Sequence, residues 1–177
     1  MRIIGGKYSR RLFRPPANLP VRPTTDLARE SLFNILEHKT DIEDSNILDL
    51  FSGTGAIAYE FASRGCKNAL AVEKNFRCVR FIKDTALSFG MEQIKVIKAD
   101  VFRFLQSTSA RYNIIFADPP YALENIPEIR DLVFERELLL PEGWLVIEHP
   151  AEADLTKHPN FVEHRRYGHV HFSFFKR

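Results

Sequence analysis

The sequence predicts an α/β fold, with a mostly parallel sheet that ends in an antiparallel hairpin and a basic N-terminal extension. From residue 46 onward, short apolar runs alternate with helical stretches, which is the pattern of a parallel sheet. The last two apolar runs are separated only by Gly168 and His169, so a tight turn joins them and the pair is antiparallel. Residues 1–25 contain six basic residues and no acidic residue.

The N-terminal segment is expected to be extended before the first helix begins. Residues 1–23 contain two glycines and four prolines, which favour a short strand or hairpin over about 2–13 and a proline-stiffened arm over 14–23. A helix follows at about 25–38, because Thr24-Thr25-Asp26 supplies an N-cap and an acid for the first turn, and apolar residues then recur at helical spacing.

The remaining elements follow from the alternating pattern. Five strands are predicted, at Asn46–Phe51, Ala69–Glu73, Ile94–Lys98, Asn113–Ala117 and Gly143–Glu148. Helices between them are predicted at about 55–64, 75–89, 101–109 and 124–139. After Pro150 we expect one short helix and then the hairpin of Phe161–Tyr167 and Val170–Phe175, which gives seven strands in all.

Length and composition indicate one domain with a sizeable core. The chain has 177 residues, 45% of them hydrophobic and 27% charged. No window approaches the roughly 20 apolar residues that span a bilayer, and the basic start lacks the apolar region of a secretory signal. We therefore expect a cytoplasmic protein with no membrane partner. Cys66 and Cys78 are too few for a disulfide scaffold and lack metal-ligand spacing.

The net charge of +2 is unevenly distributed along the chain. Residues 1–25 hold +6, whereas the other 19 basic and 23 acidic residues hold −4. Such asymmetry is typical of a segment that meets a polyanion, although a solvated N-terminus explains the charge equally well. A second basic row, on the helix at 75–89, is interpreted as a solvated face rather than a nucleic-acid contact; it consists of Lys74, Arg77, Arg80 and Lys83.

A glycine-rich turn closes the first predicted strand. It has the sequence D-L-F-S-G-T-G over Asp49–Gly55. Gly53 and Gly55 let the backbone turn tightly and approach a ligand, while the following helix offers free amides. Glu73 ends the next strand 20 residues after Gly53, where a carboxylate can accept hydrogen bonds from a ribose diol. The pattern satisfies a dinucleotide-binding fingerprint, and a plain tight turn remains the alternative.

The motif Asp118-Pro119-Pro120-Tyr121 follows the fourth strand at its carboxyl end. The two prolines fix the backbone and remove two donors, which leaves a carboxylate and rigid carbonyls as acceptors beside an aromatic ring. Two acceptors can hold the hydrogens of a planar amine while the ring stacks on the base that bears it. The amine lone pair is then directed at an electrophile, so that positioning supplies much of the rate.

These motifs together resemble those of S-adenosylmethionine-dependent amino-methyltransferases. The resemblance rests on Asp49–Gly55, Glu73, Asp100 and Asp118–Tyr121, and it covers residues 46–175. It implies the Rossmann-like methyltransferase fold for residues 25–177, with residues 1–24 as a basic arm or hairpin. It also implies S-adenosylmethionine as the methyl donor.

The flanking sequence is similar to that of bacterial 16S ribosomal RNA guanine-N2 methyltransferases. The similar segments are R-I-I-G-G-K from Arg2, V-R-P-T-T-D from Val21 and E-S-L-F-N-I-L from Glu30. The resemblance therefore spans nearly the whole chain. It implies an enzyme that methylates the N2 amine of a guanine in 16S ribosomal RNA, either free or within the small ribosomal subunit.

The resemblance also implies a role for each site residue. Asp49, Gly53, Gly55, Glu73 and Asp100 would bind the cofactor, with Glu73 on the ribose and Asp100 on the adenine amine. Asp118 and the Pro119 carbonyl would hold the guanine amine, and Tyr121 would stack on the flipped base. The basic arm would contact RNA phosphates through Arg2, Lys7, Arg10, Arg11 and Arg22.

No metal is expected, because the sulfonium group already activates the methyl group. The pair His169 and His171 is interpreted as an exposed strand face rather than as metal ligands. A monomer is expected. The alternatives are an adenine-N6 or protein-glutamine methyltransferase, a nicotinamide-dependent oxidoreductase, and a non-catalytic RNA-binding module.

Overall fold

The core of the molecule is a seven-stranded sheet with the order β3-β2-β1-β4-β5-β7-β6. The computed structural model describes residues 1–21 and 24–177. The strands are β1 (Asn46–Leu50), β2 (Asn68–Glu73), β3 (Ile94–Lys98), β4 (Tyr112–Ala117), β5 (Leu139–His149), β6 (Phe161–Tyr167) and β7 (Val170–Lys176). The first five are mutually parallel, and β7 runs antiparallel between β5 and β6. The predicted fold class is therefore confirmed.

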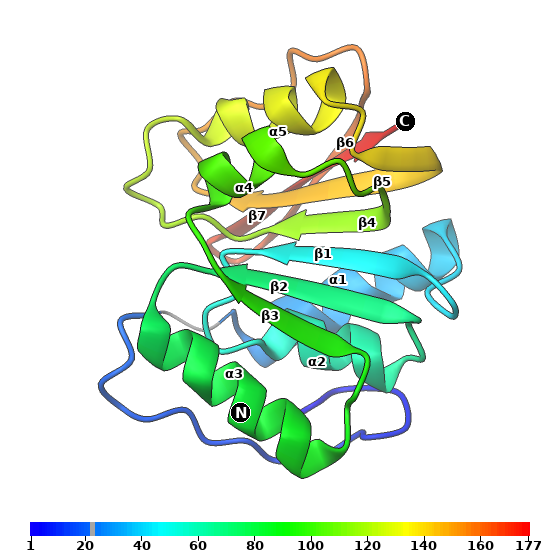
Figure 1. The fold of residues 1–177 in the computed structure, drawn as a ribbon. Coiled ribbons are helices and arrows are strands. Elements are labelled where there is room, and N and C mark those ends of the chain that lie inside the picture. Colours follow the sequence, from blue (N-terminus) through cyan, green and yellow to red (C-terminus); the bar gives the residue numbers. More distant parts are fainter. Residues whose placement is uncertain (22–23) are drawn as a thin grey trace.

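Within residues 1–21 and 24–177, five helices cover the two faces of this sheet (Figure 1). They are α1 (Asp26–Lys39), α2 (Ala56–Ser63), α3 (Phe76–Phe89), α4 (Val101–Ser107) and α5 (Ile126–Glu135). Apolar side chains of α1, α2 and α3 pack with one face of the sheet in one cluster, and those of α4 and α5 pack with the other face in a second cluster. The central strands β1 and β4 are therefore buried on both faces and apolar throughout most of their length, as a doubly covered parallel sheet requires, whereas the edge strands β3 and β6 are largely exposed.

The helix predicted at 124–139 was too long, because the chain leaves the helix after Glu135. Glu137 adopts a positive φ of 52°, and the Leu138 amide donates back to the Val133 carbonyl at 3.0 Å. This reversal lets β5 begin at Leu139, four residues before the predicted strand. Periodicity could not separate the end of the helix from the start of the strand, since both are apolar.

One further prediction was wrong, and another was confirmed in part. The short helix expected after Pro150 does not form: residues 150–160 make only local turns, such as the Ala153 amide donating to the Pro150 carbonyl at 3.1 Å. The short strand or hairpin expected over 2–13 is a loop whose two ends pair antiparallel, with a bridge between Arg2 and Leu12 and a hydrogen bond from the Ile3 amide to the Arg11 carbonyl at 3.0 Å. Both cysteines are free and buried.

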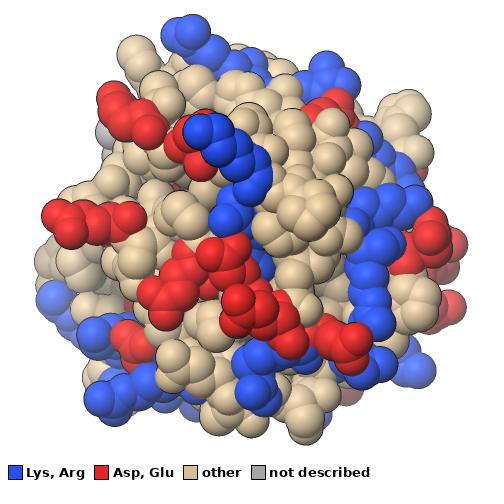
Figure 2. Space-filling model, turned by 90° about the horizontal axis from the view of Figure 1, so that it is seen from above, with Lys and Arg blue, Asp and Glu red and all other residues tan. Residues whose placement is uncertain are grey.

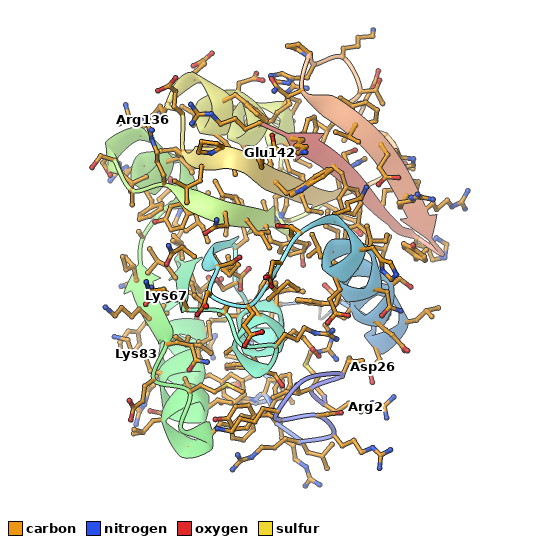
Figure 3. All side chains as sticks on the ribbon, turned by 90° about the vertical axis from the view of Figure 1, so that its right-hand side faces the viewer. Arg2, Asp26, Lys67, Lys83, Arg136 and Glu142 are labelled. Atoms are coloured by element: carbon orange, nitrogen blue, oxygen red, sulfur yellow. The ribbon has the colours of Figure 1, made fainter. Side chains whose placement is uncertain are left out.

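The N-terminal loop is packed into the domain. Ile3 is fully buried and Phe13 is 4% exposed, both in the cluster beneath α1 and α2. The carboxylate of Glu60 on α2 accepts hydrogen bonds from the backbone amides of Ile4 and Gly5. Arg2 also pairs with Asp26 at 2.9 Å, and Figure 3 shows the two side chains next to each other where the loop meets α1.

Gly6 allows this close approach. It has a φ of 73°, and a Cβ atom there would lie 2.0 Å from the Ser63 carbonyl oxygen. The adjacent Lys7 amide donates to that same carbonyl at 2.7 Å. Behind it, the guanidinium of Arg29 is fully buried, 3.8 Å from Glu60 and 2.6 Å from Asp26. Arg29 also donates to the Arg2 carbonyl at 2.9 Å, so buried charged side chains of both α1 and α2 contact the loop.

Candidate active site

The sheet register brings four strand ends to one edge. Leu50 pairs with Val72 on β2 and with Ala117 on β4, and Ala117 pairs with Ile147 on β5. The carboxyl ends of these four strands therefore lie side by side, on the left-hand edge of the sheet in Figure 1. Glu73, Asp118 and Glu148 stand directly at or after these positions. In parallel α/β sheets this carboxyl edge is where ligands bind.

The glycine turn after β1 leaves amides available at the start of α2. Gly55 has a φ of 81° and, as the N-cap of α2, offers no side-chain acceptor to the first amides of the helix. One of these amides, that of Ala58, donates instead to the buried carboxyl group of Asp49. A Cβ atom at Gly55 would lie 2.8 Å from the Tyr59 ring and 2.9 Å from Ile82. Glycine is thus required both by the backbone conformation and by the close packing of the turn against α3.

Glu73 fixes this turn in place. Its Oε2 atom accepts the Gly53 amide at 2.8 Å, and its Oε1 atom accepts the Asn75 amide at 2.8 Å. Each carboxylate oxygen has a second acceptor direction, so the group can still receive hydroxyl donors. The structure thus brings Gly53 and Glu73 together, as the fingerprint predicted.

Asp49 is a buried acid with an acceptor that has no donor. Its side chain is 1% exposed, and its Oδ2 atom has no hydrogen-bond partner among the described residues. Burial, with a contribution from the negative charge of Glu73, raises the pKa of Asp49 to about 8. A buried carboxyl group in this state is suited to a cationic or polar donor that arrives with a ligand.

Asp100 occupies a different structural position from the other acids. It is the N-cap of α4, where Oδ1 accepts the Arg103 amide at 3.2 Å, and Oδ2 lies 3.6 Å from the exposed Lys74 ammonium. The side chain is 36% exposed. Its predicted contact with an adenine amine stays a prediction.

The D-P-P-Y segment places a carboxylate and an aromatic ring next to each other. Pro119 is buried, whereas Tyr121 is 41% exposed and its ring borders open solvent. The Asp118 amide donates to the Leu50 carbonyl at 3.3 Å, which ties this segment to the glycine turn. Burial, and then the charges of Glu148 and Asp49, raise the pKa of Asp118 well above the usual carboxyl range.

Two residues that sequence reasoning did not select complete this cluster. The Thr24 hydroxyl lies 3.4 Å from Asp118 and 3.2 Å from Glu148, and the Tyr121 hydroxyl donates to Glu148 at 3.1 Å. Glu148 had a signal in the sequence, because it ends the fifth predicted strand at the same edge as the other acids. Thr24 lies in the V-R-P-T-T-D segment of the resemblance, but nothing in that segment indicates its partners, which lie 94 and 124 residues away in the chain.

A depression of about 280 Å³ opens beside Tyr121. It is lined by Tyr121, Pro150, Ala151, Glu152, Arg166, Gly168, His169 and His171. His171 stacks on His164 with 5.0 Å between the ring centroids. Within residues 1–21 and 24–177, no group of His, Cys, Asp and Glu is arranged to hold a metal ion.

The basic residues of the N-terminal segment are mostly displayed to solvent. Arg2, Lys7, Arg10 and Arg11 are exposed, and the guanidinium of Arg11 lies 4.2 Å from the centroid of the Phe89 ring. Arg22, also predicted to contact RNA, lies outside the described residues. Figure 2 looks onto the α5 side, opposite the N-terminal loop, and there acidic side chains gather in the middle of the face.

No described helix is long and apolar enough to cross a membrane.

Comparisons with known proteins agree with this geometry. A family model described as "Conserved hypothetical protein 95" matches residues 1–176. The "Putative rRNA methyltransferase YlbH" of Bacillus subtilis is 31% identical over 161 residues, which cover 89% of this chain and 86% of that protein. "Ribosomal RNA small subunit methyltransferase D" of Escherichia coli K12 is 31% identical, covering 93% of this chain and 83% of its own length.

Solved structures extend the likeness to the whole fold. "Putative methyltransferase yhhF" from Escherichia coli covers 100% of this chain and 97% of its own, with a TM-score of 0.88 and 28% identity. A more distant structure that shares the fold, SMU.776, was solved with SAH bound, at a TM-score of 0.66 and 16% identity. The chain therefore belongs to the Conserved hypothetical protein 95 family, alongside the ribosomal RNA small subunit methyltransferase D proteins, and it is a methyltransferase with the Rossmann-like fold of the S-adenosylmethionine-dependent enzymes.

Proposed function

We propose that the protein transfers a methyl group from S-adenosylmethionine to the exocyclic N2 amine of a guanine in 16S ribosomal RNA, in the cytoplasm. The observation that carries this proposal is the position of Asp118 and Tyr121 at the same sheet edge as the glycine turn and Glu73. The names of the family's relatives, which include small-subunit ribosomal RNA methyltransferases, support the substrate class.

The donor site is supported by residues whose polar groups fit S-adenosylmethionine. The unpartnered oxygen of Asp49 suits the ammonium group of the methionine moiety, and Glu73 keeps acceptor directions for the two ribose hydroxyls. Gly53 and Gly55 keep the turn free of side chains around the methionine moiety, and Asp100 is assigned to the adenine amine. When bound, the cofactor supplies a methyl group on a positively charged sulfur.

On the acceptor side, Asp118 and the Pro119 carbonyl take the two hydrogens of the guanine N2 amine, while Tyr121 stacks on the base. This turns the nitrogen lone pair toward the methyl carbon. As the new N–C bond forms, the S–C bond breaks and a neutral thioether leaves. N2 then loses one proton, and Asp118, whose raised pKa makes it a stronger base than an ordinary aspartate, receives it.

The basic arm, residues 1–24, supplies the affinity that base flipping requires. Unstacking a guanine costs free energy that contacts elsewhere must offset. Arg2, Lys7, Arg10, Arg11 and Arg22 are assigned to RNA phosphates, which give affinity without reading sequence.

The catalytic assignment is tested with labelled methyl groups and small-subunit particles from a strain that lacks this methylation. We expect wild-type protein to label 16S ribosomal RNA, and Asp118→Ala to bind the cofactor in calorimetry without transferring label. Asp84→Ala, which removes an exposed acid from α3, is the matched control and should transfer normally. Wild-type turnover by Asp118→Ala would overturn the assignment.

The arm is tested by removing charges rather than residues. Truncation would also remove Ile3 and Phe13 from the core, so it would confuse RNA binding with folding. The double variant Lys7→Gln, Arg10→Gln changes only exposed side chains, and the same change at Arg77 and Arg80 on α3 is its control. For the arm variant alone, we expect weaker RNA binding. The slope of the logarithm of its RNA-binding constant against the logarithm of salt concentration should become shallower by up to about 0.9 for each lost phosphate contact. Equal effects of the two variants would contradict the role of the arm.

A further inference from the structure

The site contains one carboxylate more than the methyl transfer needs. Glu148 at the end of β5 is only 4% exposed, and it neighbours Asp118 because Ile147 pairs with Ala117. The hydroxyl of Thr24 lies within reach of both carboxylates, at 3.2 Å and 3.4 Å. Asp118 and the Pro119 carbonyl already supply one acceptor for each hydrogen of an amine, so the N2 amine does not account for Glu148.

Guanine offers a third donor beside its amine. On the Watson–Crick edge, the N1–H group lies directly next to the N2 amine, whereas adenine has an unprotonated acceptor nitrogen at N1. An ionised carboxylate only accepts hydrogen bonds. A carboxylate next to the one that holds the amine is therefore complementary to guanine and repels the lone pair of adenine N1.

We propose that Glu148 accepts the N1–H of the target guanine and thereby makes the enzyme specific for guanine. This inference rests on the proposed function, since it requires the guanine amine to lie at Asp118. Glu148 is then a specificity-determining residue, and Thr24 and Tyr121 position its carboxylate through their hydroxyl groups. An unmatched buried polar group is costly, so a base that lacks N1–H is disfavoured by roughly 10- to 100-fold.

A different role for Glu148 predicts a different result. If the carboxylate only held Tyr121 in its stacking orientation, its replacement would lower the rate equally for every base. The ratio of kcat/KM values for two bases separates the two roles. The most informative base is 2-aminopurine, which keeps the N2 amine but has an acceptor instead of N1–H.

The experiment uses small-subunit particles reassembled with 16S ribosomal RNA that carries either guanosine or 2-aminopurine at the mapped target position. We expect the wild-type enzyme to prefer guanosine strongly. In Glu148→Gln, the amide group donates to N1 of 2-aminopurine and accepts from N1–H of guanine, so the preference should fall at least tenfold. Loss of the O6 atom in 2-aminopurine affects both enzymes alike and cancels when their preferences are compared.

Two control variants keep the test specific. Tyr121→Phe and Thr24→Val remove the hydroxyl partners of Glu148 but leave its carboxylate, so their rates fall while the preference for guanosine persists. Cofactor binding by calorimetry verifies that each variant is folded. An unchanged preference in Glu148→Gln would overturn this inference alone, whereas a wild-type enzyme that methylates no guanine would overturn the proposed function itself.

Discussion

Replacing Asp49 with asparagine should stabilise the protein, and the gain should grow with pH. The unfolded chain ionises Asp49 near its ordinary pKa of 3.8, whereas burial raises the folded pKa to about 8. Between these values the folded state binds one more proton than the unfolded state, so stability falls as pH rises. The loss is about 1.4 kcal/mol per pH unit, or roughly 3 kcal/mol between pH 5 and pH 7.

The assay is urea denaturation of the wild-type protein and Asp49→Asn in parallel at pH 5, 6 and 7. All other titrating groups are common to both proteins, so the difference in unfolding free energy isolates Asp49. We expect this difference to rise in favour of the variant by roughly 3 kcal/mol over that range, while the affinity for S-adenosylmethionine falls. Parallel stability profiles across the three pH values would refute the assignment of Asp49 as a buried, protonated acid.

Three further results follow from the same geometry. Glu60→Gln removes the fully buried carboxylate that faces the Arg29 guanidinium and accepts the loop amides, and it leaves the half-exposed Asp26 as the carboxylate partner of Arg29. The unfolding free energy in urea titrations should therefore fall by about 2 kcal/mol, and a loss below about 1 kcal/mol would contradict this role of Glu60. Gly6→Ala forces a left-handed backbone onto a Cβ residue 2.0 Å from a carbonyl oxygen, so we expect a lower melting temperature and weaker RNA binding in filter assays; unchanged values would show that the loop does not need this contact. Methyl transfer needs ionised Asp118, so the rate of methyl transfer should rise with pH. Glu148→Gln removes a negative charge that raises the pKa of Asp118, so the rise in rate should occur at lower pH in this variant. A rise at higher pH would contradict the charge interaction between Glu148 and Asp118.

The fold was predictable because its signals are local. Alternating apolar runs and helices locate the parallel strands, and the Gly168 turn identifies the closing hairpin. The boundary at Leu139 was missed because a backbone reversal at Glu137 ends the helix without a glycine or proline to mark it. The antiparallel pairing over 2–13 was predictable because it is local, but it extends over few residues. The contacts of this loop with Glu60 on α2 lie more than 50 residues away in the chain and have no local signal.

The candidate site was predictable where a motif is contiguous. Gly53 and Gly55 share one turn, and Glu73 falls beside it because parallel strands in register end together. Glu148 could be expected at this edge, because it ends a predicted strand. Its position beside Asp118, and that of Thr24, depend on the order of strands in the sheet and on the return of the chain before α1. Sequence spacing carries no record of these contacts, so the structure was needed to assemble them.

The most direct test of the central proposal identifies the methylated nucleoside. Small-subunit particles from a strain that lacks the modification are incubated with the enzyme and S-adenosylmethionine, and the 16S ribosomal RNA is digested and analysed by mass spectrometry. We expect one new N2-methylguanosine at a single position, and none with Asp118→Ala. Methylation of adenine N6, or of a protein glutamine, with no N2-methylguanosine would contradict the account.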